Sequence, residues 1–67
     1  MLVLTKRRVD HRWSKGELAR RARMTPADAG KIESGRLVPY PSQLVKLAVA
    51  LGLAADRANE LMGVAER

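Results

Sequence analysis

The sequence predicts an all-α fold, a small bundle of about five short helices. Alanine and leucine, which favour helices, are abundant, whereas the aromatic residues that are common in sheets are limited to Trp13 and Tyr40. Apolar residues recur at helical spacing in the second half of the chain. Residues typical of helix starts and ends then divide the sequence into five segments.

The length and composition narrow the class of protein. With 67 residues, we expect one domain that spans residues 1–67. The chain has no cysteine and one histidine, His11, so we expect neither a disulfide nor a Cys/His metal site. The apolar start, residues 1–4, is too short for a membrane span or a signal peptide. We therefore expect a cytoplasmic protein that binds no membrane, metal or cofactor.

The state of the first segment is left open by its pattern. Leu4 and Val9 are expected to point inward, and Trp13 is expected in the core rather than as a stacking platform. Residues 1–4 suit either a helix or a short extended arm. His11 is expected at the surface, next to an aspartate.

The second segment opens with a capping box. The Ser14 hydroxyl is expected to accept from the third helical amide, and the Glu17 side chain is expected to reach back to the capping residue. The predicted helix covers residues 15–22. Its inward face consists of Leu18, Ala19 and Ala22.

The third segment also has a clear start and end. Thr25 is expected to cap it, and Pro26 takes the first helical position, where a missing N–H costs nothing. The predicted helix runs to about Ser34 and stops at Gly35, which suits a left-handed conformation. Its core residues are expected to be Ala29 and Ile32.

The remaining two segments follow a stiff loop over residues 36–40. Pro41 begins a fourth helix with an amphipathic stripe, which Gly52 ends. The last helix is expected over about residues 55–62, ending near Gly63, and residues 64–67 are expected to fray. The stripe consists of Leu44, Leu47, Ala48 and Leu51.

Charge is distributed unevenly along the chain, whose net charge is +6. Residues 1–36 contain ten basic and four acidic residues, whereas basic and acidic residues balance over 37–67. An anionic partner, most simply nucleic acid, accounts for this asymmetry. A solvated face that only aids solubility is the alternative. One histidine without a nucleophile or paired carboxylates makes no catalytic set, so no enzyme activity and no catalytic residue is expected.

Two short capped helices joined by the tight turn at Arg23 and Met24 have the layout of a helix-turn-helix. The blocks that carry a resemblance are Ser14-Lys15-Gly16-Glu17-Leu18-Ala19, Met24-Thr25, Ile32-Glu33-Ser34-Gly35-Arg36, Leu44-Val45-Lys46-Leu47-Ala48 and Ala50-Leu51-Gly52. Together they resemble the Cro/repressor-type helix-turn-helix family, which includes the lambdoid phage repressors and the xenobiotic-response-element regulators. The resemblance covers roughly residues 4–61. It implies a lambda-repressor-like five-helix fold, a repressor-type transcriptional regulator, double-stranded operator DNA as partner, and a homodimer.

The resemblance also implies roles for single residues. The base-reading positions are Pro26, Ala27, Gly30 and Lys31, and the phosphate-contacting positions are Lys15, Thr25, Ser34, Arg36 and Tyr40. Arg8 and Glu33 match a pair that ties the first helix to the third. The alternatives are that this pair is exposed and weak, and that Tyr40 only packs against its flanking prolines.

The sequence departs from the family pattern in two ways. Arg23 replaces the glycine usual in the turn, so a positive φ there would cost strain. The reading face is also poor in side-chain donors: only Lys31 can donate to guanine, Ala27 can touch a thymine methyl, and Asp28 either accepts from cytosine or supports the helix start.

A protein partner is the alternative to DNA as the main function. In that case the domain is an antitoxin or a regulator of the transcription machinery, with DNA binding secondary. The weak reading face favours this alternative, and the basic first half opposes it. A dimer or partner interface is expected on apolar residues of the neutral half, and the alternative is that the same residues belong to the core. They are Val45, Val49, Leu53, Leu61 and Met62.

Overall fold

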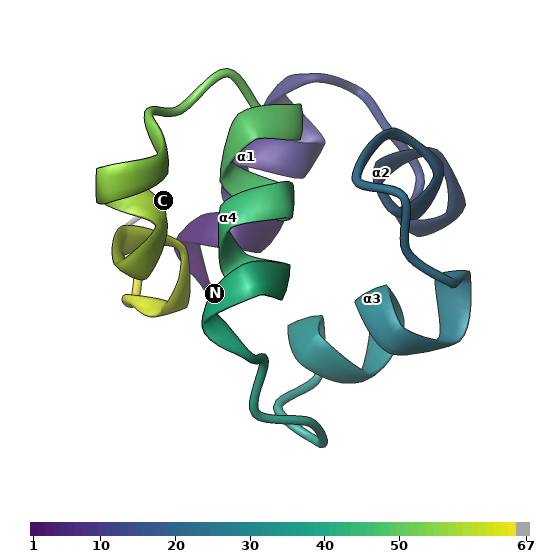
Figure 1. Ribbon diagram of the computed structural model, residues 1–67. Helices are drawn as coiled ribbons and strands as arrows, with labels where there is room; N and C mark the ends of the chain where they lie inside the picture. The colour runs from purple at the N-terminus through teal and green to yellow at the C-terminus, as the bar shows by residue number, and fades with distance from the viewer. Residues whose placement is uncertain (66–67) are drawn as a thin grey trace.

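The computed structural model describes residues 1–65, and within them the fold is all-α, as predicted (Figure 1). Its central helix, α4, has α1 behind it, the α2–α3 pair on one side and a 3₁₀ helix, η1, on the other. The elements are α1 (Val3–Asp10), α2 (Lys15–Arg21), α3 (Pro26–Glu33), α4 (Pro41–Ala50) and η1 (Ala55–Met62).

The core draws one large, fully buried side chain from each of these elements. They are Leu4 of α1, Leu18 of α2, Ile32 of α3, Leu47 of α4 and Leu61 of η1. Removing such a side chain from water stabilises the fold by about 1.5–3 kcal/mol each before entropy is counted. Each helix is too short to be stable alone, so this shared core positions all five.

The predicted caps of α2 and α3 are present. Ser14 Oγ accepts from the Glu17 amide at 3.1 Å, and Thr25 Oγ1 accepts from the Asp28 amide at 3.2 Å. The second half of the predicted capping box is absent, because the Glu17 carboxylate binds two arginines of its own helix instead. Pro26 starts α3, as predicted.

All four α-helices end in a residue with positive φ. Gly35 (φ +80°) follows α3 and Gly52 (φ +84°) follows α4, as expected from their sequence positions. Arg23 (φ +57°) and Arg12 (φ +61°) take the same role after α2 and α1. In each case the next amide bonds back to a carbonyl in the last helical turn, such as Met24 N to Ala19 O at 2.8 Å. The strain anticipated for Arg23 is therefore present, and Arg12 adds a second strained site.

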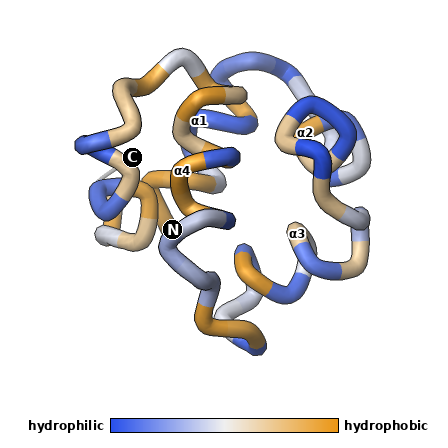
Figure 2. The backbone as a smooth tube through the Cα atoms, viewed as in Figure 1, coloured by the Kyte–Doolittle hydropathy of each residue, from blue (hydrophilic) through white to orange (hydrophobic). Residues whose placement is uncertain are grey.

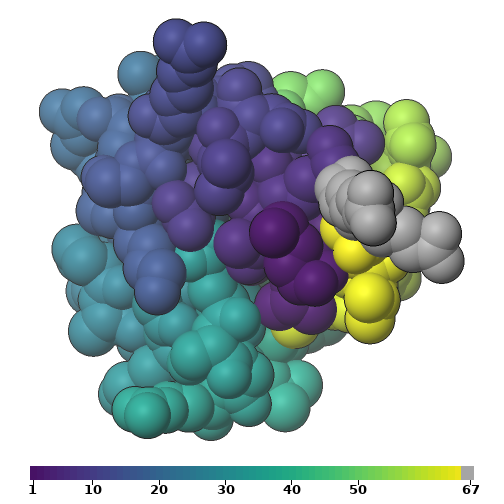
Figure 3. Space-filling model, turned by 180° about the vertical axis from the view of Figure 1, so that it is seen from behind, coloured from purple at the N-terminus to yellow at the C-terminus, as the bar shows by residue number. Residues whose placement is uncertain are grey.

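The two ends of the described chain pair with each other. Leu2 forms an antiparallel bridge with Val64, and the Ala65 amide donates to the Met1 carbonyl at 2.7 Å. Figure 3 shows the N-terminal and C-terminal segments side by side. The fraying predicted at Val64 is therefore wrong, while residues 66–67 lie outside the described residues. Helix α1 begins at Val3, so the start of the chain combines both alternatives, a short extended pair and then a helix.

One inward prediction in α1 is wrong. Val9 is 53% exposed, whereas Leu4 is fully buried. The reason is that α1 ends one residue after Val9 and the chain turns away through Arg12. Trp13 is half-buried against the edge of the core rather than inside it.

Candidate nucleic-acid interface

Helix α3 has one buried and one exposed face. Ala29 and Ile32 are buried, whereas Ala27 and Lys31 are exposed on the other side. Pro26 is exposed at the start of the helix, and Gly30 is half-buried. A Cβ added at Gly30 would meet no atom within 4 Å, so glycine is not required there by packing. The exposed side of α3 therefore has mostly short side chains, and Lys31 is its long cationic one.

The five predicted phosphate positions are all exposed. Lys15 is the first residue of α2, and Thr25 is the capping residue of α3. Ser34 and Arg36 follow α3, where the Ser34 hydroxyl donates to the Lys31 carbonyl at 3.1 Å. Tyr40, 70% exposed, precedes α4, and its amide donates to Gln43 Oε1 at 2.8 Å. The Tyr40 ring is therefore open to solvent, and its backbone is fixed by the start of α4.

A buried ion pair joins α1 to the end of α3. Arg8 Nε donates to Glu33 Oε1 at 2.7 Å, and Arg8 Nη1 donates to the Trp13 carbonyl at 2.8 Å. The side chains are only 14% and 3% exposed, and Glu33 Oε2 is buried without a hydrogen-bond partner. The structure therefore brings together the two residues that the resemblance pairs, in the buried arrangement. This contact fixes the C-terminal end of α3 relative to α1.

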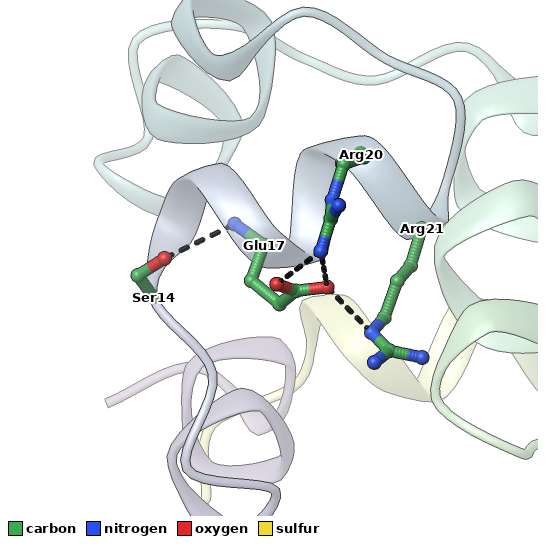
Figure 4. Close-up of polar contacts among 4 residues, drawn as sticks. All are labelled: Ser14, Glu17, Arg20 and Arg21. Carbon is green, nitrogen blue, oxygen red and sulfur yellow. Dashed lines mark hydrogen bonds and ion pairs between the residues drawn. The ribbon is translucent and has the colours of Figure 1, made fainter.

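The ion pairs of α2, unlike the buried pair between α1 and α3, form within one helix and at the surface (Figure 4). Arg20 donates to both carboxylate oxygens of Glu17 at 2.6 and 2.8 Å, and Arg21 Nε donates to Oε2 at 2.7 Å. The pKa of the Glu17 carboxyl therefore lies below its ordinary value, mainly because Arg20 donates to it and further because Arg21 does. These pairs remain exposed to solvent, so α2 neutralises part of its own positive charge locally.

Six basic residues of the first half form no ion pair within residues 1–65. They are Arg7, Arg12, Lys15, Arg23, Lys31 and Arg36. Figure 2 shows how hydrophilic residues concentrate on the loop after α1 and on α2, whereas α4 is mostly hydrophobic. Five of the six lie in α2 and α3 or within three residues of their ends, where the sequence places its candidate ligand-binding residues, whereas Arg7 lies in α1.

The aromatic residue of this region, Trp13, is contacted by two residues of its own neighbourhood. The His11 ring stacks on Trp13 with centroids 4.3 Å apart, and the Arg21 guanidinium carbon lies 4.5 Å from a Trp13 ring centroid. His11 is exposed, as predicted, and its Nε2 lies 3.3 Å from the Leu51 carbonyl. Trp13 is thus occupied by its own neighbours and offers no free stacking surface.

The residues predicted for a dimer interface differ in exposure. Leu61 is the inward side chain of η1 and is fully buried, so it follows the alternative in which these residues belong to the core. Leu53 and Met62 are half-buried and pack against the core. Val45 and Val49 are 37% and 60% exposed on the side of α4 that faces α2.

Among residues 1–65, no helix is long and apolar enough to cross a membrane. The same residues contain no group of three His, Cys, Asp or Glu side chains able to hold a metal ion.

Comparison with protein families explains the two capped helices and the turn between them. A model of the helix-turn-helix domain matches residues 2–61. The chain belongs to this family. Helix-turn-helix domains typically bind DNA, so the family indicates a DNA partner for this chain. No curated protein and no solved structure matches the chain.

The sequence assigned no ligand-binding role to three exposed basic residues near the two capped helices. Arg12 and Arg23 follow α1 and α2, and Lys46 is exposed on α4. Arg23 was recognised only as the residue that replaces a turn glycine, and Arg12 takes the same kind of position after α1. Nothing in the local sequence indicates that Lys46 lies near the end of α2.

Proposed function

We propose that this helix-turn-helix domain is a repressor-type transcriptional regulator of the Cro/repressor class, which binds double-stranded DNA sequence-specifically with α3 in the major groove. The observation that carries the proposal is Lys31. It is exposed, forms no ion pair in the described chain, and stands on the face of α3 opposite the buried Ala29 and Ile32. A lysine ammonium in that position can donate to the O6 and N7 acceptors of guanine.

In this proposal the two groups of residues act differently. Base edges meet Pro26, Ala27, Gly30 and Lys31, and phosphates meet Lys15, Thr25, Ser34, Arg36 and Tyr40. Because only one of the four base-reading residues has a long donor, few base pairs are read directly. Affinity then comes largely from phosphates, and part of the specificity comes from the shape of the DNA.

The regulator is proposed to act as a homodimer on a short inverted repeat. A two-fold arrangement that places the two α3 helices one DNA turn apart, roughly 34 Å, fits such a site. Contact through the η1 side, with Leu53 and Met62, keeps the basic halves of the two copies apart. Sedimentation of the protein, free and on DNA, tests this. A monomer at high concentration in both cases would count against the dimer.

The test of the main proposal is the salt dependence of binding to duplex DNA. With about five phosphate contacts, the plot of log affinity against log salt concentration should have a slope of roughly −4 to −5. Selection of bound sequences from a random pool then determines the operator. A flat salt response, or a pool without sequence preference, would contradict the proposal.

A second candidate function is binding to a protein, as an antitoxin or a regulator of the transcription machinery, with DNA secondary. The observation in its favour is the α3 surface itself, where Pro26, Ala27 and Gly30 offer no side-chain donor. Its signature would be weak DNA binding without sequence preference, together with a specific protein complex.

A further inference from the structure

The side of α4 that faces the end of α2 forms an open groove of about 370 Å³. Its floor is apolar and consists of Ala22 from α2 and Val45, Val49 and Ala50 from α4. Val45 and Val49 are four residues apart, so their side chains stack along one face of the helix. They are 37% and 60% exposed, although the residues beside them on the inner face, Leu44 and Ala48, are buried.

The rim of the groove is positively charged. Arg21 and Arg23 come from the end of α2 and Lys46 from α4, and no acidic residue is among the lining residues. The Arg21 charge is partly compensated, because its Nε donates to Glu17 and its guanidinium lies over Trp13. Arg23 and Lys46 form no ion pair within residues 1–65. Two uncompensated cations therefore line the groove beside its apolar residues, one just after α2 and one in α4.

We propose that this groove binds an acidic, amphipathic helical segment of a partner protein, with two apolar side chains on the floor and carboxylates against Arg23 and Lys46. The groove spans residues 45–50 of α4, about 8 Å at the rise of a helix, which matches two anchors one helical turn apart. An amphipathic partner of opposite charge complements a surface of this kind, in which exposed apolar side chains lie beside uncompensated charges of one sign. This inference deepens the second candidate function and does not depend on DNA binding.

DNA and a second copy of the chain fit the groove less well. The apolar floor offers nothing to a phosphate, and the groove lies at the end of α2 opposite Lys15, about 9 Å along the helix. A two-fold contact through the groove would bring Arg23 and Lys46 of both copies together, which repels. Both occupants are distinguished from the proposed one by the experiment below.

The experiment uses the full chain labelled with ¹⁵N and a synthetic peptide of about 12 residues, which contains two leucines one turn apart and flanking glutamates. Amide shifts are followed as the peptide is added up to about 1 mM, a range in which weak complexes are still detected. Shifts centred on residues 21–23 and 45–50 are expected. A peptide with lysines in place of the glutamates, and one with serines in place of the leucines, should produce none.

Two pairs of variants test the floor and the rim. Val49→Asn should weaken peptide binding about tenfold, whereas Val9→Asn, at a valine of similar exposure outside the groove, should change it less than about twofold. Arg23→Gly should weaken binding several-fold and make it less sensitive to salt, without loss of folding, because glycine suits the positive φ there. Arg12→Gly relieves the same kind of strain outside the groove and should leave binding unchanged.

Several results would overturn the proposal. They are shifts caused equally by the lysine peptide, shifts at the groove caused by duplex DNA or by protein concentration alone, and no shift with any peptide. Each variant is also titrated with duplex DNA. Val49→Asn should bind DNA like the unmodified chain, because the net charge and the α3 surface are unchanged. In the unmodified chain, DNA binding without any peptide binding contradicts only the groove, and peptide binding without any DNA binding contradicts only the DNA proposal.

Discussion

Helices α2 and α3 are alike in length and in their caps but differ in how they hold charge. Each contains a glutamate bound to arginine: Glu17 in α2 is paired with Arg20 and Arg21 on its own helix, at the surface. Glu33 in α3 is paired with Arg8 from another helix, and its side chain is 3% exposed. The difference shows that the same glutamate–arginine ion pair can neutralise surface charge in one helix and fix the position of the next helix.

The exposed cations follow the same division. The arginines of α2 are satisfied by Glu17, whereas Lys31 of α3 has no acidic partner within residues 1–65. A count of charges along the sequence therefore overestimates the positive charge with which α2 can attract an anion. It also underestimates single cations without an acidic partner, such as Lys31 and Lys15.

The largest expected effect concerns the two glutamates. Glu33→Ala should lower the free energy of unfolding by about 3 kcal/mol or more, because it leaves the buried Arg8 charge without its partner. Glu17→Ala should cost far less, because its arginines remain solvated. Urea unfolding of both variants measures the difference. The double variant Arg8→Met/Glu33→Leu should recover much of the loss, and equal effects of the two single variants would show that the buried pair is not special.

Lys31 should matter next most, now for DNA rather than stability. On the best selected sequence, Lys31→Ala should cost about 1–3 kcal/mol of binding free energy and relax the preference at one or two base pairs. On random duplex the loss should be small. Fluorescence anisotropy with both duplexes measures it. A sequence-independent loss would mean that Lys31 contacts only phosphate and that DNA shape supplies the specificity.

Replacement of Lys15 is expected to affect DNA binding in the opposite way to replacement of Lys31. Because it lies at the start of α2, where it can meet the DNA backbone, Lys15→Ala should weaken binding to all sequences alike. The slope of log affinity against log salt should become less steep by about one. The Lys31→Ala variant, titrated over the same salt series, is the matched control, and a sequence-specific loss for Lys15→Ala would exchange the roles of the two lysines.

The smallest effect is the pH dependence contributed by Glu17. Its pKa is below the ordinary value of 4.5 in the folded chain, so its ion pairs stabilise the fold above about pH 4.5 and are lost as the pH falls through the lowered pKa. The difference in melting temperature between the unmodified chain and Glu17→Gln should therefore be largest near neutral pH and vanish in acid. A difference that is constant with pH would show that Glu17 acts through packing instead.

The sequence alone determined the features that depend on near neighbours. Ser14, Thr25 and the prolines at helix starts act within one turn, and Gly35 and Gly52 act through their own backbone freedom, so their roles could be predicted locally. The α4 stripe is local in the same sense. The DNA partner followed from the helix-turn-helix layout and charge, and the pairing of Arg8 with Glu33 followed from a family resemblance rather than from the residues themselves.

Only the tertiary structure decided the features that depend on distant parts of the chain. Whether Leu61 or Val49 is buried depends on which sides of η1 and α4 are covered, and both are apolar residues at helical positions. The pairing of Leu2 with Val64, and the groove between α2 and α4, join residues that are more than twenty positions apart. Local periodicity contains no information on such contacts, because packing, not propensity, selects which apolar surfaces meet.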